Sequence, residues 1–224
     1  MFENQTVARR SAESVLTTNR VLRNTYALLS LTLLFSSVTA GVSMAIHAPP
    51  MAYLLSIGAS FLLLWLVLPR TENSSAGIWV VFAVTGLLGF GLGPILNLYM
   101  ALANGPQLIM TALGGTGVIF LGLSGYVLTT RKDFSFLGGF LFVGFVVVLL
   151  AALANIFLQI PAMSLALSSA VILIMSGFIL FDTSRIIHGG ETNYIRATVG
   201  LYLNIYNIFI NLLSLLGALS GDDR

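Results

Sequence analysis

The chain has 224 residues, of which 57% are hydrophobic and only 8% are charged, and its formal net charge is +2. A soluble domain carries about 25% charged residues, so most of this surface faces a medium other than water. The composition therefore predicts an integral membrane protein. The small net charge gives no indication of nucleic-acid binding. The absence of cysteine excludes a disulfide framework, a thiolate catalyst and a cysteine-ligated metal.

Residues 1–24 form a polar N-terminal segment. It carries Arg9, Arg10, Arg20 and Arg23 and lacks an apolar stretch long enough for a signal sequence. We expect a solvated cytoplasmic tail that helps to set the topology. The alternative interpretation is a flexible docking handle.

Seven apolar segments follow, each close to the roughly 20 residues that span a ~30 Å hydrocarbon core. Because they are continuous apolar runs rather than short alternating ones, they favour helices over a barrel. The sequence predicts an all-α fold with one seven-helix transmembrane domain at residues 25–219 and a short acidic external tail at residues 220–224. The expected spans are residues 25–46, 51–68, 76–101, 107–128, 136–157, 162–181 and 195–219.

The charges of the connecting loops alternate along the chain. The loops after the first, third and fifth spans carry no Lys, Arg, Asp or Glu, whereas those after the second, fourth and sixth spans and the N-terminal segment are basic. The positive-inside rule places basic loops in the cytoplasm. We therefore expect a cytoplasmic N-terminus and a C-terminus on the opposite side.

The third span is rich in glycine, with the sequence GLLGFGLGPILN from Gly86 to Asn97. In lipid, small residues permit the close approach that holds helices together. The alternative is a hinge at Gly93 and Pro94, like the broken helices that transporters place around substrate. No other span shows a matching break, so the pattern favours packing.

Three amides lie inside the last span. Asn204, Asn207 and Asn211 are spaced i, i+3 and i+7 and share one helical face. Because polar groups are costly in lipid, we expect this face to point inward and the last helix to be central. Structural hydrogen bonding between helices and a lining for water or an ion both remain open.

Asp182 lies at the end of the sixth span and also has two interpretations. It is either an interfacial carboxylate paired with Arg185, or a partly buried acid that titrates near neutral pH. If the last two spans pack as an antiparallel hairpin, Asp182 and Asn204 become neighbours.

No catalytic pattern is present in the sequence. HExxH, GxSxG and a phosphate-binding loop are absent, and the serines of the spans lack an intramembrane His or Lys to activate them. Intramembrane aspartyl chemistry would need two aspartates, and only Asp182 qualifies. We therefore expect a protein that is not an enzyme and that needs no cofactor or metal.

Four stretches resemble the Bax-inhibitor family of seven-span proteins: GLGPIL at residues 91–96, RKDFSFLGG at 131–139, LFDTSRIIHGG at 180–190 and LYLNIYNIFINLL at 201–213. The resemblance covers essentially the whole chain after the N-terminal segment. The runs VLRNTYALLSLTLLFS and IIHGGETNYIRATVGLY resemble a proteobacterial inner-membrane branch known for modulating the membrane-anchored AAA protease FtsH. The resemblance implies a bundle whose last helix is central and wrapped by the other six.

In calcium-leak members of that family, two aspartates of the last two helices share a proton and form a pH-sensitive latch with a basic residue near the end of helix two. Asp182 matches the first aspartate, Asn204 stands at the second, and Arg70 is the candidate basic partner. The asparagine removes one negative charge and the like-charge coupling of the pair. This departure argues against a pH-gated calcium function here.

Two functions follow from the resemblance. The first is an inner-membrane modulator of an FtsH-like protease, acting as an inhibitor or a slow substrate, with the protease and the lipid bilayer as partners. The alternative is a pH-sensitive calcium or cation leak channel with a modified aspartate latch.

Overall fold

The structure is a computed structural model that describes the backbone of residues 2–221 and the side chains of Leu16 and residues 18–220. Seven of its helices are long and apolar enough to cross a membrane, which confirms the predicted all-α transmembrane fold. Of the expected acidic tail, residues 222–224 lie outside the described residues. The elements are α1 (Phe2–Ala45), α2 (Met51–Leu62), a π-helical turn (Leu63–Val67), α3 (Leu68–Thr71), α4 (Ala76–Met100), α5 (Gly105–Thr130), α6 (Leu137–Leu158), α7 (Pro161–Ile187) and α8 (Tyr194–Gly221).

Local signals in the sequence account for most helix ends. Pro106 and Pro161 lie in the first turns of α5 and α7, where the missing N–H of proline leaves no hydrogen bond unmade. Arg131 and Gln159 follow α5 and α6 with φ of 52° and 53°, and such left-handed residues commonly end helices.

The second span passes through Pro69 without ending. A proline ring inside an α-helix collides with the carbonyl group one turn earlier, and the π-helical turn at Leu63–Val67 widens the helix directly before this residue. The span therefore continues into α3 and ends at Thr71, beyond the expected end at Leu68.

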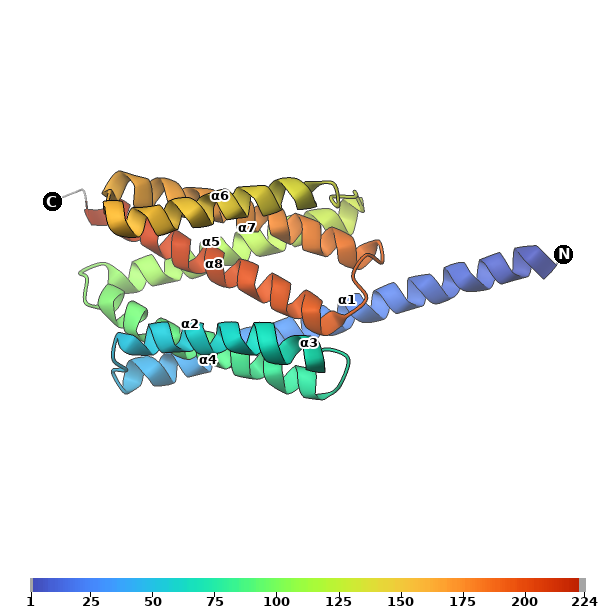
Figure 1. Cartoon of the computed structure of the whole chain (residues 1–224), viewed down its shortest axis with the longest axis horizontal. Helices are drawn as coiled ribbons and strands as arrows, with labels where there is room; N and C mark the ends of the chain where they lie inside the picture. Colours follow the sequence, from blue (N-terminus) through green and yellow to red (C-terminus); the bar gives the residue numbers. More distant parts are fainter. Residues whose placement is uncertain (1, 222–224) are drawn as a thin grey trace.

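The helices form two groups with α8 crossing between them (Figure 1). In one group α4 packs against α1 and α2, and in the other α7 packs against α5 and α6. α8 packs against α1, α4, α5 and α7, but among the described residues no Cα atom of α8 lies within 8 Å of α2 or α6. The expectation that all six other helices wrap the last one is therefore not confirmed.

The glycines of α4 lie against α1. A Cβ atom at Gly93 would collide with the side chain and backbone of Ser43, and one at Gly89 would collide with the carbonyl oxygen of Ser36. These positions admit only a hydrogen atom, so the two backbones approach closely, as the packing interpretation predicts. Pro94 lies inside α4 without ending it.

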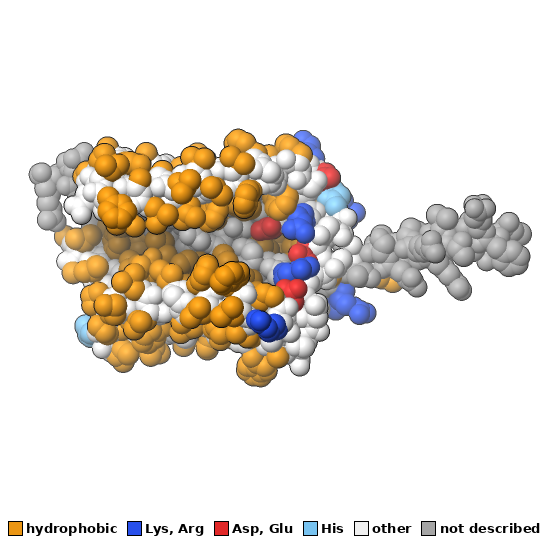
Figure 2. Space-filling view, viewed as in Figure 1, with side chains coloured by type: hydrophobic (Ala, Val, Ile, Leu, Met, Phe, Trp, Pro, Cys, Tyr) orange, Lys and Arg blue, Asp and Glu red, His pale blue; other side chains and the backbone are white. Residues whose placement is uncertain are grey.

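The charged side chains that the structure describes gather at one end of the bundle (Figure 2). α1 projects beyond the bundle at that same end, whereas α8 terminates at the opposite end (Figure 1). The N-terminal segment and the basic loops thus share one side, as the alternation of loop charge predicts. α1 is continuous through the expected boundary at residue 24, and its spanning part begins at Thr18.

The close contact of α4 with α1 predicts a steric effect on stability. Gly89→Ala should lower the free energy of unfolding by roughly 1–3 kcal/mol, because the new methyl group meets a backbone oxygen that cannot rotate away. Gly122→Ala on α5 is the control, since a Cβ atom there has nothing within 4 Å. Alanine favours a helix over glycine by ~1 kcal/mol, so this control should be neutral or stabilising.

Denaturation of both variants in one detergent measures the difference. Equal changes for Gly89→Ala and Gly122→Ala would contradict the assigned packing.

Candidate functional site

The carboxylate of Asp182 meets the amide of Asn204 where α7 packs against α8. Asn204 Nδ2 donates a hydrogen bond of 2.8 Å to Asp182 Oδ2. Asp182 is half-buried and Asn204 is 6% exposed. Hydrogen bonds to an ionised group are stronger than neutral ones, so each helix here satisfies a polar group of the other inside the membrane span.

Gly200 makes this approach possible. It lies one turn before Asn204 on α8, and a Cβ atom at its position would be 3.2 Å from Asp182 Oδ2. A larger residue would press on the carboxylate and separate the two helices. The sequence thus supplies a small residue and an amide on successive turns of α8, both facing the same carboxylate.

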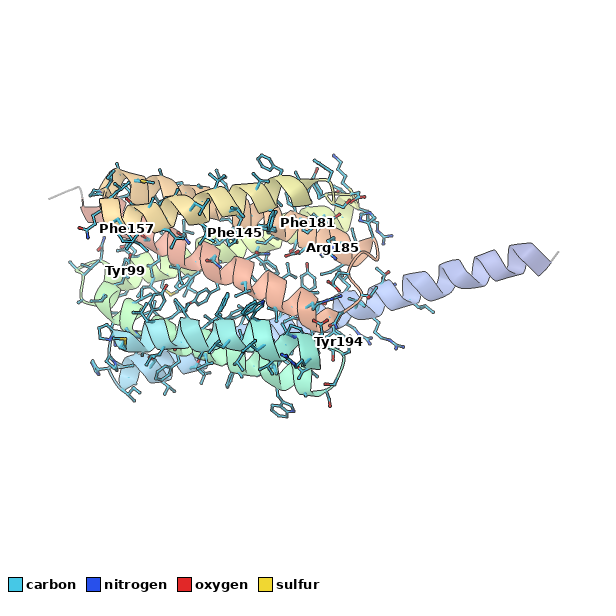
Figure 3. All side chains as sticks on the ribbon, viewed as in Figure 1. Tyr99, Phe145, Phe157, Phe181, Arg185 and Tyr194 are labelled. Atoms are coloured by element: carbon cyan, nitrogen blue, oxygen red, sulfur yellow. The ribbon has the colours of Figure 1, made fainter. Side chains whose placement is uncertain are left out.

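Charged residues cap Asp182 on the loop side. A cavity of about 110 Å³ beside the carboxylate is also lined by Arg185, Glu191 and Arg196. Glu191 lies 3.1 Å from Arg196 and 3.8 Å from Arg185. Arg185 also lies over the Phe181 ring, 5.5 Å from its centroid (Figure 3).

The interpretation in which Asp182 pairs with Arg185 has no matching ion pair among the described residues. The ion pairs of the described residues join the two arginines to Glu191 and, at 3.3 Å, Arg196 to Glu72. The carboxylate of Asp182 therefore relies on the Asn204 amide. The glutamates hold the arginines of the cap at the rim of the cavity.

Asn193 ties the two charged loops together and starts α8. Its Oδ1 accepts hydrogen bonds from the N–H groups of Ile195 and Arg196, at 2.9 Å and 3.3 Å, and its Nδ2 donates to the Glu72 carbonyl at 2.9 Å. It therefore serves as the N-cap of α8. The sequence analysis missed it, although an asparagine directly before an apolar helix is a cap signal.

Arg70 is not brought to Asp182. Its side chain is exposed and donates to the backbone carbonyl of Leu66 on its own helix. It lies outside the lining of the cavity beside Asp182, whose arginines are Arg185 and Arg196. The basic residues facing the carboxylate thus come from α7 and α8, and not from the end of the second span.

Asn207 and Asn211 differ from Asn204 in their bonding. Asn207 Nδ2 donates to the Leu203 carbonyl and Asn211 Nδ2 to the Asn207 carbonyl, each at 2.8 Å. Both amides are half-buried and bond to their own helix. Of the three amides, Asn204 is the one for which the described residues show a bond between helices. The lining for water or an ion stays a prediction.

A second polar cluster lies between the loop before α6 and the end of α7. Ser184 Oγ donates to Asp133 Oδ1 at 3.3 Å and accepts from the Phe134 N–H at 2.8 Å. The Ser135 N–H also donates to Asp133, and this hydrogen bond holds the pKa of the Asp133 carboxyl below its usual range. These hydrogen bonds fix the loop before α6 against the end of α7. The cluster was not predicted from the sequence.

The spanning part of the chain matches a known protein family over its full length. Residues 18–221 match the family described as Inhibitor of apoptosis-promoting Bax1. The chain belongs to this family. The resemblance recognised from the four sequence stretches is therefore confirmed.

Bacterial relatives match over almost their full length. A protein of Escherichia coli K12 named Modulator of FtsH protease YccA is 56% identical over 209 residues, which are 93% of this chain and 94% of that protein. The relative from Escherichia coli O6:H1 has the same identity and is named Inner membrane protein YccA. A membrane protein of Vibrio cholerae is 52% identical over 95% of this chain and 96% of its own length. The predicted likeness to the proteobacterial branch is thus confirmed.

Within this family the chain has one carboxylate and one amide where the resemblance implied two carboxylates. In the part of the chain that the structure describes, no three His, Cys, Asp or Glu side chains gather as a metal site would need. The Asp182–Asn204 pair supplies one charge and one neutral donor. What this arrangement provides directly is a hydrogen bond between α7 and α8.

This hydrogen bond predicts an asymmetry between two substitutions. Asn204→Leu should destabilise the protein by roughly 1–3 kcal/mol, because it leaves a half-buried carboxylate without its donor. Asp182→Asn is the matched control: it removes the charge and keeps a carbonyl oxygen that accepts from Asn204, so its effect should be smaller. Thermal denaturation in detergent compares the two, and a larger loss for Asp182→Asn would disprove the assigned roles.

Proposed function

We propose that this chain is an inner-membrane modulator, without enzymatic activity, of a membrane-anchored AAA protease of the FtsH type. The observation that carries the proposal is the 56% identity, over 93% of the chain, to a protein named Modulator of FtsH protease. The family match at residues 18–221 includes all seven spans. We extend the role of that relative to this chain because the match covers 93% of this chain and 94% of the relative.

The shape of the chain suggests action as a slow substrate. The backbone of α1 projects beyond the bundle at the end that carries the charged loops (Figure 1). Most of the stability of a helix in a protein comes from packing against other elements, and this part of α1 lies beyond the bundle, so it unwinds at little cost. A protease that pulls substrates from an accessible end would begin there.

The bundle supplies the resistance that slows such a substrate. α1 continues from the projection into the span whose Ser36 and Ser43 lie against glycines of α4. The close contact extends over about two turns of helix. The protease must therefore break all the contacts of this length together before the first span leaves the bundle. A protease engaged in this way remains occupied.

A reconstituted protease assay tests the modulator role. The protease in vesicles should degrade a second membrane substrate more slowly when this chain is added in molar excess. The control is an equal amount of an unrelated seven-span protein, which accounts for crowding of the vesicle membrane. An unchanged half-life of the second substrate would refute the proposal.

A truncation tests the projecting helix as the starting point. Deletion of residues 2–15 removes most of the projection and leaves the spanning part from Thr18 intact. We expect the truncated chain to be degraded more slowly and to inhibit less, because the protease has less free backbone to engage. Replacement of residues 2–15 by a Gly/Ser sequence of equal length should restore turnover. Unchanged degradation after the deletion would exclude this segment as the handle.

The proposal includes an orientation with the N-terminus in the cytoplasm and the C-terminus in the periplasm. The basic loops and the N-terminal segment support it through the positive-inside rule. Because the chain lacks cysteine, the single substitutions Lys132→Cys and His47→Cys each introduce one thiol. The reaction of that thiol with a membrane-impermeant reagent tests the orientation. In intact cells with a permeable outer membrane, the cysteine at position 47 should react and the one at position 132 should not.

The cation-leak alternative has less support, because the polar centre offers one carboxylate that is already bonded to Asn204. Liposomes that carry a calcium dye test it directly. A calcium flux that Asp182→Asn abolishes would favour the leak over the modulator.

A further inference from the structure

An apolar cavity lies between α1 and α5, away from Asp182. Its volume is about 440 Å³, and α4 and α8 form its floor. Among the residues that the structure describes, no Cα atom of α1 lies within 8 Å of one of α5. The two helices meet through the rings of Tyr26 and Phe120, whose centroids are 6.0 Å apart. Apart from this ring contact the backbones of the two side walls stay apart, and α4 and α8 pack together beneath them.

The cavity has the length of one membrane leaflet. Its wall on α1 runs from Leu33 to Met44 and its wall on α5 from Ile109 to Phe120. At 1.5 Å per residue each wall is about 16 Å long, close to half of a ~30 Å hydrocarbon core. Both walls lie in the half of the bundle next to the uncharged loops, and the Tyr26–Phe120 contact lies at the end nearer the charged loops.

Glycines on both walls keep the cavity open. Gly41 on α1 and Gly117 on α5 line it, and a Cβ atom at either position would have nothing within 4 Å. Glycine destabilises a helix by ~1 kcal/mol relative to alanine, and none of the described neighbours requires glycine at these positions. The free space they preserve is available to a molecule from outside the chain.

The polar groups of the walls are already bonded within the protein. Ser36 Oγ lies 2.7 Å from the Tyr202 hydroxyl, and Ser37 and Thr116 donate to carbonyl groups of their own helices. On the floor of the cavity, Tyr206 has a buried hydroxyl with no partner among the described residues. Apart from this hydroxyl the cavity presents an apolar surface, which suits a hydrocarbon chain and not a headgroup.

We propose that this cavity binds one acyl chain of a membrane lipid. The chain enters sideways between α1 and α5 from the leaflet at the uncharged loops, and its headgroup stays at the membrane surface. The volume lies within the ~300–1,000 Å³ range of small-molecule sites. A leaflet-deep cavity of about 440 Å³ has room for a single chain, whereas a helix of about 10 Å diameter and the same length occupies roughly 1,200 Å³.

Photocrosslinking of the reconstituted full chain tests the site. The probe is a phosphatidylethanolamine with a diazirine near the end of one acyl chain, at trace level in vesicles of phosphatidylethanolamine and phosphatidylglycerol. Illumination followed by peptide mapping should label the facing walls at Leu33–Met44 and Ile109–Phe120 above the lipid-facing surface of α6, which serves as the reference for bulk lipid.

Two variants fill the cavity and one matched variant does not. Gly117→Leu and Gly41→Leu place a side chain where the acyl chain would lie, so labelling of the facing wall should fall by about tenfold, the loss expected when two methylene groups lose their burial. Gly122→Leu lies on the same helix, also has open space at its Cβ position, and does not line the cavity. It should label like the unmodified chain.

The outcomes separate the occupants. Labelling of the walls no stronger than that of α6, or unchanged in both filled variants, would overturn the proposal. The proposal would also be overturned if a protein helix were the occupant, that is, if Gly117→Leu removed a crosslink to such a helix and left the lipid labelling intact. If one filled variant does not fold, the other still decides, because the two glycines lie on opposite walls.

Discussion

Inside lipid the hydrophobic effect does not drive the helices of this protein together, and the whole structure depends on the interactions that replace it. Close backbone packing and a few hydrogen bonds between helices must hold the bundle. The chain uses the first device between α1 and α4, where Gly89 and Gly93 admit α1. It uses the second between α7 and α8, where Asn204 donates to Asp182. α8 packs against both groups of helices and so connects the part of the bundle held by the α1–α4 contact with the part held by the α7–α8 hydrogen bond.

The arrangement around Asp182 follows from the same constraint. A carboxylate within a span is tolerated when donors compensate it, and here the compensation is an amide within the membrane. The arginines at the rim are engaged by Glu191 and Glu72. With a neutral partner in place of a second acid, the hydrogen bond does not need a shared proton. A fixed structural link therefore fits this site better than a proton-operated latch.

The features readable from the sequence are those set locally. The seven spans follow from the apolar segments along the chain. The grouping of the basic loops with the N-terminal segment follows from the alternation of loop charge. The contact of Asp182 with Asn204 follows from the antiparallel hairpin. Arg70, the candidate basic partner, lies beyond the π-helical turn and donates to the Leu66 carbonyl, and it does not line the cavity beside Asp182. Bonding between helices was one of two interpretations of Asn207 and Asn211, but an amide can also satisfy its N–H groups on the carbonyl one turn earlier. Sequence spacing shows which face an amide occupies and does not show which acceptor it selects.

The order of these contacts along the chain bears on the proposed role. A protease that engages the N-terminus meets the contacts of Tyr26 and then the α1–α4 contact early in extraction, and the Asp182–Asn204 bond only near the end of the chain. Resistance to the first pulling steps therefore depends on the contacts of α1, including those at Gly89 and Gly93. The α7–α8 hydrogen bond contributes to global stability and has little influence on the first pulling steps. Degradation rate and thermal stability should accordingly respond to different residues, because extraction follows the chain in order whereas denaturation samples the whole bundle at once.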